Sequence, residues 1–363
     1  AASLLQLRSR RAGVHLCDPA TGRATIEGGH PAFLELLRAP RGGACRTLGA
    51  RDYDFAHEGG AYFPSRDAVL FSSGRLDAGA AGPHVVLSLA DLRTGKIDAL
   101  PERIWREEIV MANGCVQETD ESAVVTSQGT MEKRSGLFRL HIGNMTVEPV
   151  VTSTPLAEAT GQFNSPNDVV VDPISGQLLF TDPMYGFIQG FRPPPQVGNW
   201  LWAYDPREGG PAQDAGRSRI LADQLLRPNG VAFAEGRGDR VYVSDTGYVL
   251  GADFEPLSVP ARRVAADAAS KSDIHPLAPR HIYAFDVERD ARGHVHMLGN
   301  KRIFATPMSG IPDGIKVDCQ GNVYTGVGNG IAVYAKDGIY LGTFLEDRGC
   351  PNMVLVPRGP ETE

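Results

Sequence analysis

The most regular feature of the chain is a short apolar run that opens on polar or small residues and recurs six times. The runs are rich in Val, Ile, Phe and Tyr, which is the composition of a β-strand. Six segments share this pattern: His57–Phe63, Ala112–Val116, Pro166–Val171, Pro228–Phe233, Pro312–Val317 and Pro351–Val356. An internal repeat of this kind indicates one supersecondary unit used several times, so we interpret each copy as the first strand of a unit.

The clearest complete unit runs from Asp313 to Glu346 and predicts four short strands. Its apolar runs lie at 314–317, 322–325, 330–334 and 339–344, separated by turns rich in Gly and Asp. A similar hairpin follows the third copy, where the turn Asp172–Gly176 leads into the apolar run Gln177–Thr181. Four consecutive antiparallel strands form one blade of a β-propeller, so the repeat predicts an all-β, six-bladed propeller.

Spacing along the chain predicts that some blades carry insertions. Successive copies begin about 40 to 85 residues apart, whereas a compact blade takes roughly 40 to 50. The two clearest insertions are 187–199, with three consecutive prolines, and 246–280, which lacks strand alternation. Long loops on a rigid scaffold commonly shape binding sites, so these two segments are expected to influence substrate choice.

The last copy begins too close to the end of the chain to complete a blade. Residues 1–56 contain further apolar runs that can supply the missing strands beside 350–357. A ring closed by pairing the N- and C-terminal strands leaves no exposed sheet edge, which is the main hazard of an open β-structure. We therefore expect 1–363 to form a single propeller domain rather than two domains.

Composition narrows the function classes. The 363 residues are 42% hydrophobic and carry a formal net charge of −7, which does not favour nucleic acid as a partner. No window approaches the roughly 18 apolar residues needed to cross a bilayer, so we expect a soluble protein, secreted or cytoplasmic. None of the five cysteines lies in a CxxC or Cys/His pattern, which argues against a zinc or redox site.

The polar residue at the start of each copy is the candidate functional residue. Innermost strands of a propeller line its central channel, so equivalent positions converge on one axis. These positions hold Glu58, Asn113, Asn167, Asn229, Asp313 and Asn352. Asn-Gly and Asp-Gly are also ordinary turn dipeptides, but six copies in register with acids in two of them favour an all-oxygen cage for a hard cation such as Ca²⁺.

Several of these motifs resemble the gluconolactonase and senescence-marker-protein family, especially its fungal-type lactonohydrolases. The motifs are HEGGAYFP at 57–64, SPND at 165–168 with FTDPMYG at 180–186, RPNGV at 227–231 with VSDT at 243–246, and IPDG at 311–314. The likeness spans roughly residues 55 to 357, and paraoxonases and diisopropyl fluorophosphatase look like more distant kin.

The resemblance implies a propeller that hydrolyses a small-molecule lactone with Ca²⁺ as cofactor, some members accepting Zn²⁺, Mn²⁺ or Mg²⁺. It implies that Glu58, Asn167, Asn229 and Asp313 are the metal ligands. Paraoxonases hold a second calcium through an acid that follows the first-blade Glu. Here that position is Gly59, so a second ion is not expected.

Cys45 and Cys350 lie near the two chain ends that meet in the closing blade. A disulfide between them would clamp the ring, as the same placement does in paraoxonases. Two buried thiols are the alternative, and the sequence does not decide between them.

Lactone hydrolysis needs an activator for the carbonyl and a base for water. Asp313 is the leading candidate for the base, because a carboxylate at the ion can also accept a proton. Asp168 is expected to point away from the channel and orient Asn167. His57 would act in proton transfer or, because strand alternation opposes it facing the channel beside Glu58, pack at the blade edge.

Three further residues are expected to line the pocket and bind substrate: Asn113, Tyr185 and Asp245. Each lies close to the start of a first strand or just after a second strand.

Three rival readings remain open at the sequence level. The same site would activate a phosphoryl group, so an organophosphate or aryl-ester hydrolase is the first. A propeller that only binds a partner protein is the second, because a fold does not imply a function. Strictosidine-synthase-like propellers, which do not rely on this metal set, are the third.

Overall fold

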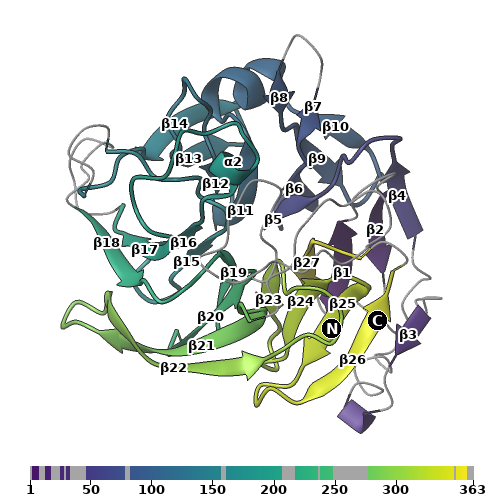
Figure 1. The fold of residues 1–363 in the computed structure, drawn as a ribbon. Helices are drawn as coiled ribbons and strands as arrows, with labels where there is room; N and C mark the ends of the chain where they lie inside the picture. Colours follow the sequence, from purple (N-terminus) through teal and green to yellow (C-terminus); the bar gives the residue numbers. More distant parts are fainter. Residues whose placement is uncertain are drawn as a thin grey trace.

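The computed structural model describes residues 2–7, 13–17, 25–27, 30–32, 46–77, 82–156, 161–206, 217–235, 238–247, 277–346 and 349–357. Within them the chain forms antiparallel sheets set around a common centre, which is the architecture of a β-propeller (Figure 1). The all-β propeller predicted from the repeat is therefore confirmed.

Each repeated segment contributes the first strand of one sheet, as predicted. These strands are β5 (Glu58–Phe63), β11 (Ala112–Thr119), β15 (Val169–Val171), β19 (Pro228–Phe233), β23 (Ile315–Val317) and β27 (Asn352–Pro357). They contact one another in that order, and β27 in turn contacts β5. The first strands therefore surround the centre, where their opening residues can meet.

The remaining strands extend each sheet outward. The sheet of β5 continues with β6 (Ala68–Ser72), β9 (Leu87–Asp91) and β10 (Ile97–Ala99); that of β11 with β12 (Ser122–Ser127), β13 (Gly136–His141) and β14 (Thr146–Val151); that of β15 with β16 (Leu178–Asp182), β17 (Trp200–Tyr204) and β18 (Ser218–Ala222); that of β19 with β20 (Arg240–Asp245), β21 (His281–Arg289) and β22 (Val295–Ala305). Two short strands, β7 (Leu76–Asp77) and β8 (Pro83–His84), form a separate ribbon.

The two sheets nearest the chain ends are built differently. β23 is followed by β24 (Val323–Val327), β25 (Gly330–Tyr334) and β26 (Tyr340–Leu345), the four strands predicted for 313–346, and β3 (Thr25–Glu27) pairs with β26 as a fifth. β27 pairs with β1 (Ala2–Leu7), which is followed in the sheet by β2 (Gly13–Cys17) and β4 (Arg46–Ala50). Five sheets thus have four strands and one has five.

The core lies between neighbouring sheets rather than at the centre. Phe163, Phe180 and Trp202 are buried together, and the ring of Phe163 meets the other two edge-on at 5.2 and 5.4 Å between centroids. Val124 and Leu137 of the preceding sheet pack against the same cluster. Apolar faces that interlock in this way hold the sheets at fixed angles, so the central positions rest on a rigid scaffold.

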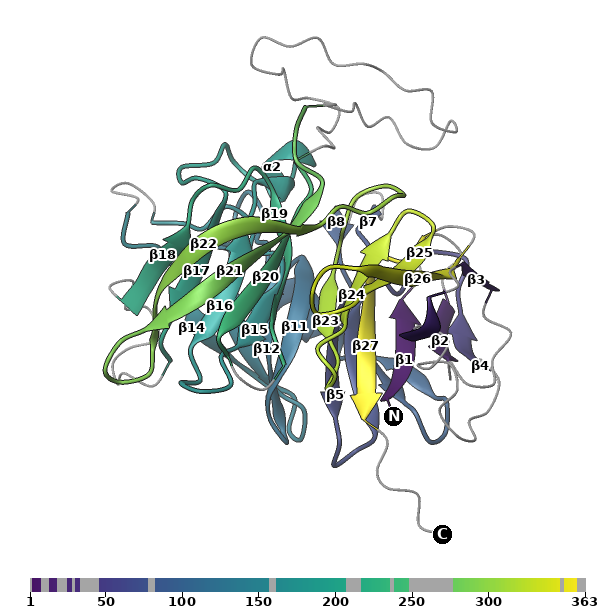
Figure 2. The ribbon, with the colours of Figure 1, turned by 90° about the horizontal axis from the view of Figure 1, so that it is seen from below.

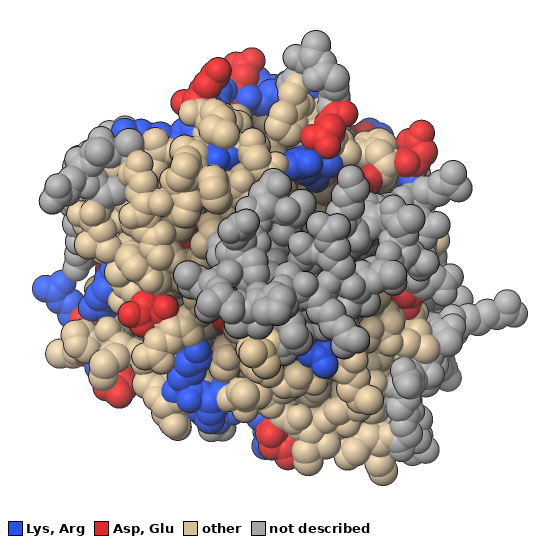
Figure 3. Space-filling model, viewed as in Figure 1, with Lys and Arg blue, Asp and Glu red and all other residues tan. Residues whose placement is uncertain are grey.

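Helical structure is sparse in the described residues. One turn of π-helix, η2 (Ile104–Glu108), precedes β11, and one turn of α-helix, α2 (Tyr185–Ile188), follows β16. In the view turned by 90°, α2 lies beyond one end of the strands (Figure 2). No helix in this part of the chain combines the length and apolar character that crossing a membrane requires. On the face seen in Figure 3, the described acidic and basic side chains are interspersed.

Candidate functional site

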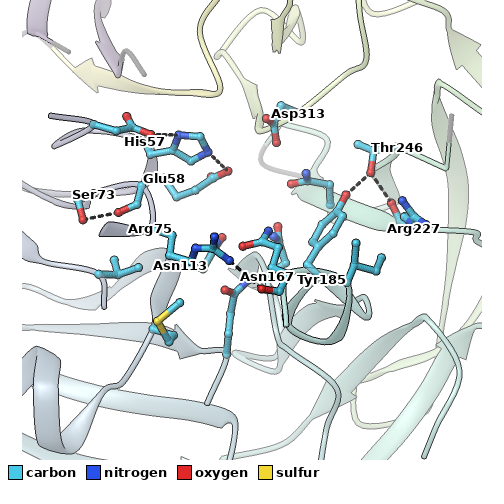
Figure 4. Close-up of a pocket in the computed structure, with 18 of the residues that line it drawn as sticks. His57, Glu58, Ser73, Arg75, Asn113, Asn167, Tyr185, Arg227, Thr246 and Asp313 are labelled. Atoms are coloured by element: carbon cyan, nitrogen blue, oxygen red, sulfur yellow. Dashed lines mark hydrogen bonds and ion pairs between the residues drawn. The ribbon is translucent and has the colours of Figure 1, made fainter. Parts of the chain in front are cut away.

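A cavity of about 380 Å³ opens at the end of the ring where α2 lies. Five sheets contribute to it through the residues that open their first strands. These residues are Glu58, Asn113, Asn167, Asn229 and Asp313. The close-up shows Glu58, Asn113, Asn167 and Asp313 facing one another across the cavity (Figure 4). The convergence expected from the repeat is therefore present in the structure.

Four side-chain oxygens in this cavity are buried without a hydrogen-bond donor among the described residues. They are Oδ1 of Asn113, Asn167, Asn229 and Asp313. Leaving one buried acceptor unpaired costs roughly 1–3 kcal/mol, so four at one point require a compensating positive group. Amide and carboxylate oxygens are the ligands that Ca²⁺ prefers, and the residues present therefore fit a hard divalent cation.

The cluster is poor in the side chains that bind softer metals. In the described part of the chain, no group of three or more His, Cys, Asp or Glu residues is placed to hold a metal ion. The residues that open the first strands instead bring two carboxylates, Glu58 and Asp313, together with amide oxygens. This donor set favours Ca²⁺ or Mg²⁺ over Zn²⁺.

The Glu58 carboxylate is buried beside a second acid. Its Oε2 accepts a hydrogen bond from Asn352 Nδ2 at 2.9 Å, and its Oε1 lies 3.9 Å from His57 Nε2. Burial and the negative charge of Asp313 raise the pKa of Glu58 to about 8. The same burial raises the pKa of Asp313 to about 6, against the lowering effect of His57 and of a hydrogen bond from Asn229. Two buried acids held this close favour the binding of a cation, which would lower both pKa values.

The sequence left two alternatives for His57, proton transfer at the site or packing at the blade edge, and the structure agrees with a place at the site. The His57 ring lines the cavity beside Glu58. The reason is that β5 begins at Glu58, so His57 lies outside the strand and alternation does not govern it. Its Nδ1 lies 3.2 Å from Asp54 Oδ2. Burial favours the neutral ring, but the bond to Asp54 and the charges of Glu58 and Asp313 outweigh it and raise the pKa of His57 to about 9.

Asp168 points away from the cavity, as predicted, but it does not orient the Asn167 amide. Its Oδ1 accepts the backbone N–H of Val169 at 2.9 Å, and its Oδ2 accepts that of Val231 at 3.1 Å. Val231 belongs to β19, the first strand of the next sheet. Asp168 therefore joins two neighbouring innermost strands.

Asp245 does not line the cavity, so the expected substrate contact is corrected. It ends β20, and its carboxylate accepts the backbone N–H groups of Leu226 and Arg227 at 2.8 and 2.9 Å. Asp182 ends β16 and binds Asn164 and Ser165 in the same way, at 2.9 and 2.8 Å. An acid at the end of a second strand therefore fixes the segment that leads into the first strand.

Tyr185 does line the cavity, as predicted, from the first position of α2. Its hydroxyl is hydrogen-bonded to Thr246. Sequence reasoning missed Thr246, and it missed Arg227 and Arg75 as well, which also line the cavity. Thr246 and Arg227 adjoin the repeated motifs, so their place in the repeat was a usable signal. Arg75 lies in a loop and donates to the carbonyl of Gln189, 114 positions away, which no local pattern indicates.

The glycines that follow Asn113, Asn229 and Asp313 are required by close packing around the axis. A Cβ on Gly230 would lie 2.6 Å from Asp313 O and 2.8 Å from Ile315 N. A Cβ on Gly114 would lie 2.6 Å from Asn167 O. Glycine therefore allows each innermost strand to approach the next, and the Asn-Gly pairs are not ordinary turns.

Replacing Gly230 with alanine is expected to displace Asp313 and weaken the site. The added methyl overpacks a backbone contact, at a cost of roughly 1–3 kcal/mol. We expect the affinity of the site for Ca²⁺ to fall roughly 10-fold or more, measured by isothermal titration. Gly299→Ala in β22 is the matched control, because its nearest neighbour is the Glu288 Oε1 at 3.2 Å, which can move. Equal Ca²⁺ affinity of the two variants would contradict this role for Gly230.

The expected pairing of Cys45 with Cys350 concerns one residue outside the described part of the chain, namely Cys45. Cys350 is buried, and its Sγ lies 3.1 Å from Asn352 O. The disulfide therefore stays a prediction.

Comparison with known proteins agrees with this geometry. The chain is 29% identical to a lactonohydrolase of Aspergillus oryzae over 294 residues, which is 78% of the chain and 59% of that protein. It is 26% identical to a gluconolactonase of Zymomonas mobilis over 193 residues, which is 52% of the chain and 44% of that protein. The chain is therefore similar in sequence to lactonohydrolases and gluconolactonases. The family resemblance seen in the motifs is thereby confirmed, although the chain spans under two thirds of the length of either relative.

Solved structures support the fold. A gluconolactonase from Xanthomonas campestris superposes with a TM-score of 0.60 at 23% identity, covering 89% of this chain and 85% of that one. A putative gluconolactonase superposes with a TM-score of 0.62 at the same identity. No protein-family model matches the chain.

Proposed function

We propose that the protein is a lactonase that hydrolyses a lactone ring to the hydroxy acid with a Ca²⁺-type divalent cation. The observation that carries the proposal is the group of four buried, unpaired oxygens on Asn113, Asn167, Asn229 and Asp313. The names of the two sequence relatives supply the substrate class. Glu58, Asn167, Asn229 and Asp313 would hold the ion, and the unpaired Asn113 oxygen makes that residue a further candidate.

The cation, when bound, supplies Lewis acidity that polarises the lactone carbonyl and stabilises the developing oxyanion. Asp313 accepts the proton of the attacking water through one carboxylate oxygen. With the cation bound, the Asp313 carboxylate would be ionised at neutral pH, as a base must be.

Residues around the acids hold the reacting groups in place. Asn352 fixes the Glu58 carboxylate through the 2.9 Å bond, and Asp54 holds the His57 ring. His57, with its raised pKa, is protonated at neutral pH and offers a proton to the alkoxide that leaves when the ring opens. Tyr185 lines the opposite wall and contacts substrate.

Removal of divalent cations tests the proposal most directly. We expect the native protein to hydrolyse one or more lactones in a pH-stat assay, and chelation to lower the rate at least 100-fold. Added Ca²⁺ should restore it, because the ligand oxygens belong to a rigid scaffold. Aryl esters and organophosphates belong in the same substrate panel.

Unchanged turnover after complete cation removal would refute the metal-dependent mechanism. Faster hydrolysis of an aryl ester or organophosphate than of any lactone would favour that rival on the same site. Cation binding without hydrolysis of any panel member would favour a binding propeller.

We further propose that the sheets are the six blades of one closed domain spanning 1–363. The support is the pairing of β1 with β27 over six residue pairs, from Ala2 opposite Pro357 to Leu7 opposite Asn352. β1, β2 and β4 would then complete the last blade beside β27, whereas β3 joins the preceding sheet, contrary to the expectation that all of 1–56 belongs to the last blade. Such closure protects both sheet edges.

A further inference from the structure

A row of buried hydroxyl groups links the candidate ligands from blade to blade. In four successive sheets a Ser or Thr lies near the end of the second strand: Ser72 in β6, Thr126 in β12, Thr181 in β16 and Ser244 in β20. All four side chains are fully buried. None of them lines the cavity.

Each hydroxyl donates to the backbone carbonyl of the residue that opens the next innermost strand. Ser72 Oγ reaches Asn113 O at 3.0 Å, and Thr126 Oγ1 reaches Asn167 O at 2.8 Å. Thr181 Oγ1 donates to Asn229 O at 2.6 Å, and Ser244 Oγ donates to Asp313 O at 2.7 Å. The same contact therefore occurs at four successive interfaces, always on a residue whose side-chain oxygen is unpaired.

Two of the hydroxyls also accept a hydrogen bond from a backbone N–H group of their own sheet. Thr181 Oγ1 accepts the N–H of Asp168, which follows Asn167, at 3.1 Å. Ser244 Oγ accepts the N–H of Gly230, which follows Asn229, at 2.7 Å. A continuous chain of hydrogen bonds thus runs from Asn167 through Asn229 to Asp313, so the backbone of one ligand fixes the backbone of the next.

We propose that Ser72, Thr126, Thr181 and Ser244 are positioning residues that preset the spacing of the cation ligands before the cation binds. This inference rests on the proposed function, because it concerns the ligands of the same site. Unpaired oxygens repel one another in the empty cage, and hydrogen bonds to the backbones behind them oppose that separation. A cage held in this way binds its ion without first ordering its ligands.

The chain offers a matched control in Thr325. It is equally buried and occupies the corresponding place in β24, but its Oγ1 donates to Gly326 O within its own strand, at 3.3 Å. Thr325→Val therefore removes a buried hydroxyl that donates to no candidate ligand, and the N–H of Asp313 keeps its 2.9 Å bond to the same Gly326 carbonyl. Thr181→Val removes one that joins Asp168 to Asn229.

Isothermal titration of each purified protein with Ca²⁺ tests the inference. We expect Thr181→Val to weaken Ca²⁺ binding roughly 10-fold relative to the native chain, Thr181→Ser to restore it, and Thr325→Val to change it less than 3-fold. Chemical denaturation in chelator measures stability separately, and Thr181→Val should lose more stability than Thr325→Val because it also leaves the N–H of Asp168 without its acceptor. Ser244→Ala gives an independent second case if Thr181→Val does not fold.

The outcomes separate this inference from the function on which it rests. Native Ca²⁺ affinity in Thr181→Val and Ser244→Ala would overturn the positioning role while leaving the metal site intact. An equal loss of affinity in Thr325→Val would also overturn it, since general loosening of the ring would then be the cause. No Ca²⁺ binding by the native chain would overturn the proposed function and, with it, this role.

Discussion

Replacing Asp313 with asparagine is expected to lower kcat for lactone hydrolysis roughly 10²- to 10⁴-fold, the range typical for loss of a general base. Asparagine keeps the size of the side chain and one oxygen for the ion, but it cannot accept a proton at neutral pH. Ca²⁺ binding should weaken less than kcat falls, because three other ligands remain. Kinetics at saturating Ca²⁺, together with Ca²⁺ titration of the variant, measure the two effects separately.

Asp54→Asn is the control for this experiment. Asp54 also lines the cavity, but it faces His57 at 3.2 Å and is not part of the oxygen cluster. We expect its loss to lower kcat less than the loss of Asp313 does, because Asp54→Asn weakens the hold on His57 but leaves the proposed base in place. If Asp313→Asn retained most of the activity while Asp54→Asn lost it, Asp54 and His57 would have to supply the base.

The first strands and the convergence of the repeated polar positions on one cavity could be predicted because both follow from one repeated pattern. An apolar run opened by Asn, Asp or Glu appears six times, and a propeller brings equivalent positions to one axis. The pattern also identified Asn352, which supports Glu58 by hydrogen bonding. Repetition gave information that no single copy contained, since Asn229-Gly230 alone would pass for an ordinary turn.

The functions of acids beside the repeat could not be predicted, because they depend on which backbone groups lie within reach. Asp245 and Asp168 look like site residues in the sequence, yet both bind backbone N–H groups of a first strand. The position of His57 depends in the same way on where its strand begins, since strand alternation applies only to residues inside the strand. Its side chain enters the cavity because β5 begins one residue later.

Contacts between segments far apart in the chain also could not be predicted from the sequence. Arg75 reaches Gln189 across the ring, and β3 joins the sheet of β26 instead of the sheet of β27. Both depend on how the sheets are arranged in space, and neither residue type nor spacing encodes that arrangement locally.

Replacing Asp172 with alanine is expected to lower the free energy of unfolding by roughly 3–5 kcal/mol, because it leaves a partly buried charge unpaired. The Asp172 carboxylate is fully buried and binds Arg289 through two bonds, of 2.7 and 2.8 Å. The pair joins the turn after β15 to the end of β21 and so links two neighbouring sheets. Urea denaturation of native and variant protein at pH 7 measures the loss.

The pH dependence of this loss follows from the same bond. Burial alone would raise the pKa of Asp172, but the hydrogen bonds from Arg289 and Ser175 outweigh it and lower the pKa below the value of a free aspartate. The stabilisation is therefore complete above about pH 4, the pKa in the unfolded chain, and is lost as the pH falls through the folded-state pKa. The difference between native and variant protein should shrink at low pH.

Asp286→Ala is the control, because Asp286 pairs with Arg302 at a similar distance, 2.7 Å, on a more exposed surface. Exposed pairs contribute roughly 0–1 kcal/mol, so this variant should remain near native stability. A similar small loss in Asp172→Ala would mean that Arg289 finds other partners, since it already donates to the carbonyls of Gly293 and Gly238 at 2.7 and 2.6 Å. Those carbonyls lie in turns of the sheet that contains Arg289, so they would satisfy the guanidinium without linking the two sheets. Arg289→Met, which removes all of these bonds at once, should show the full loss instead.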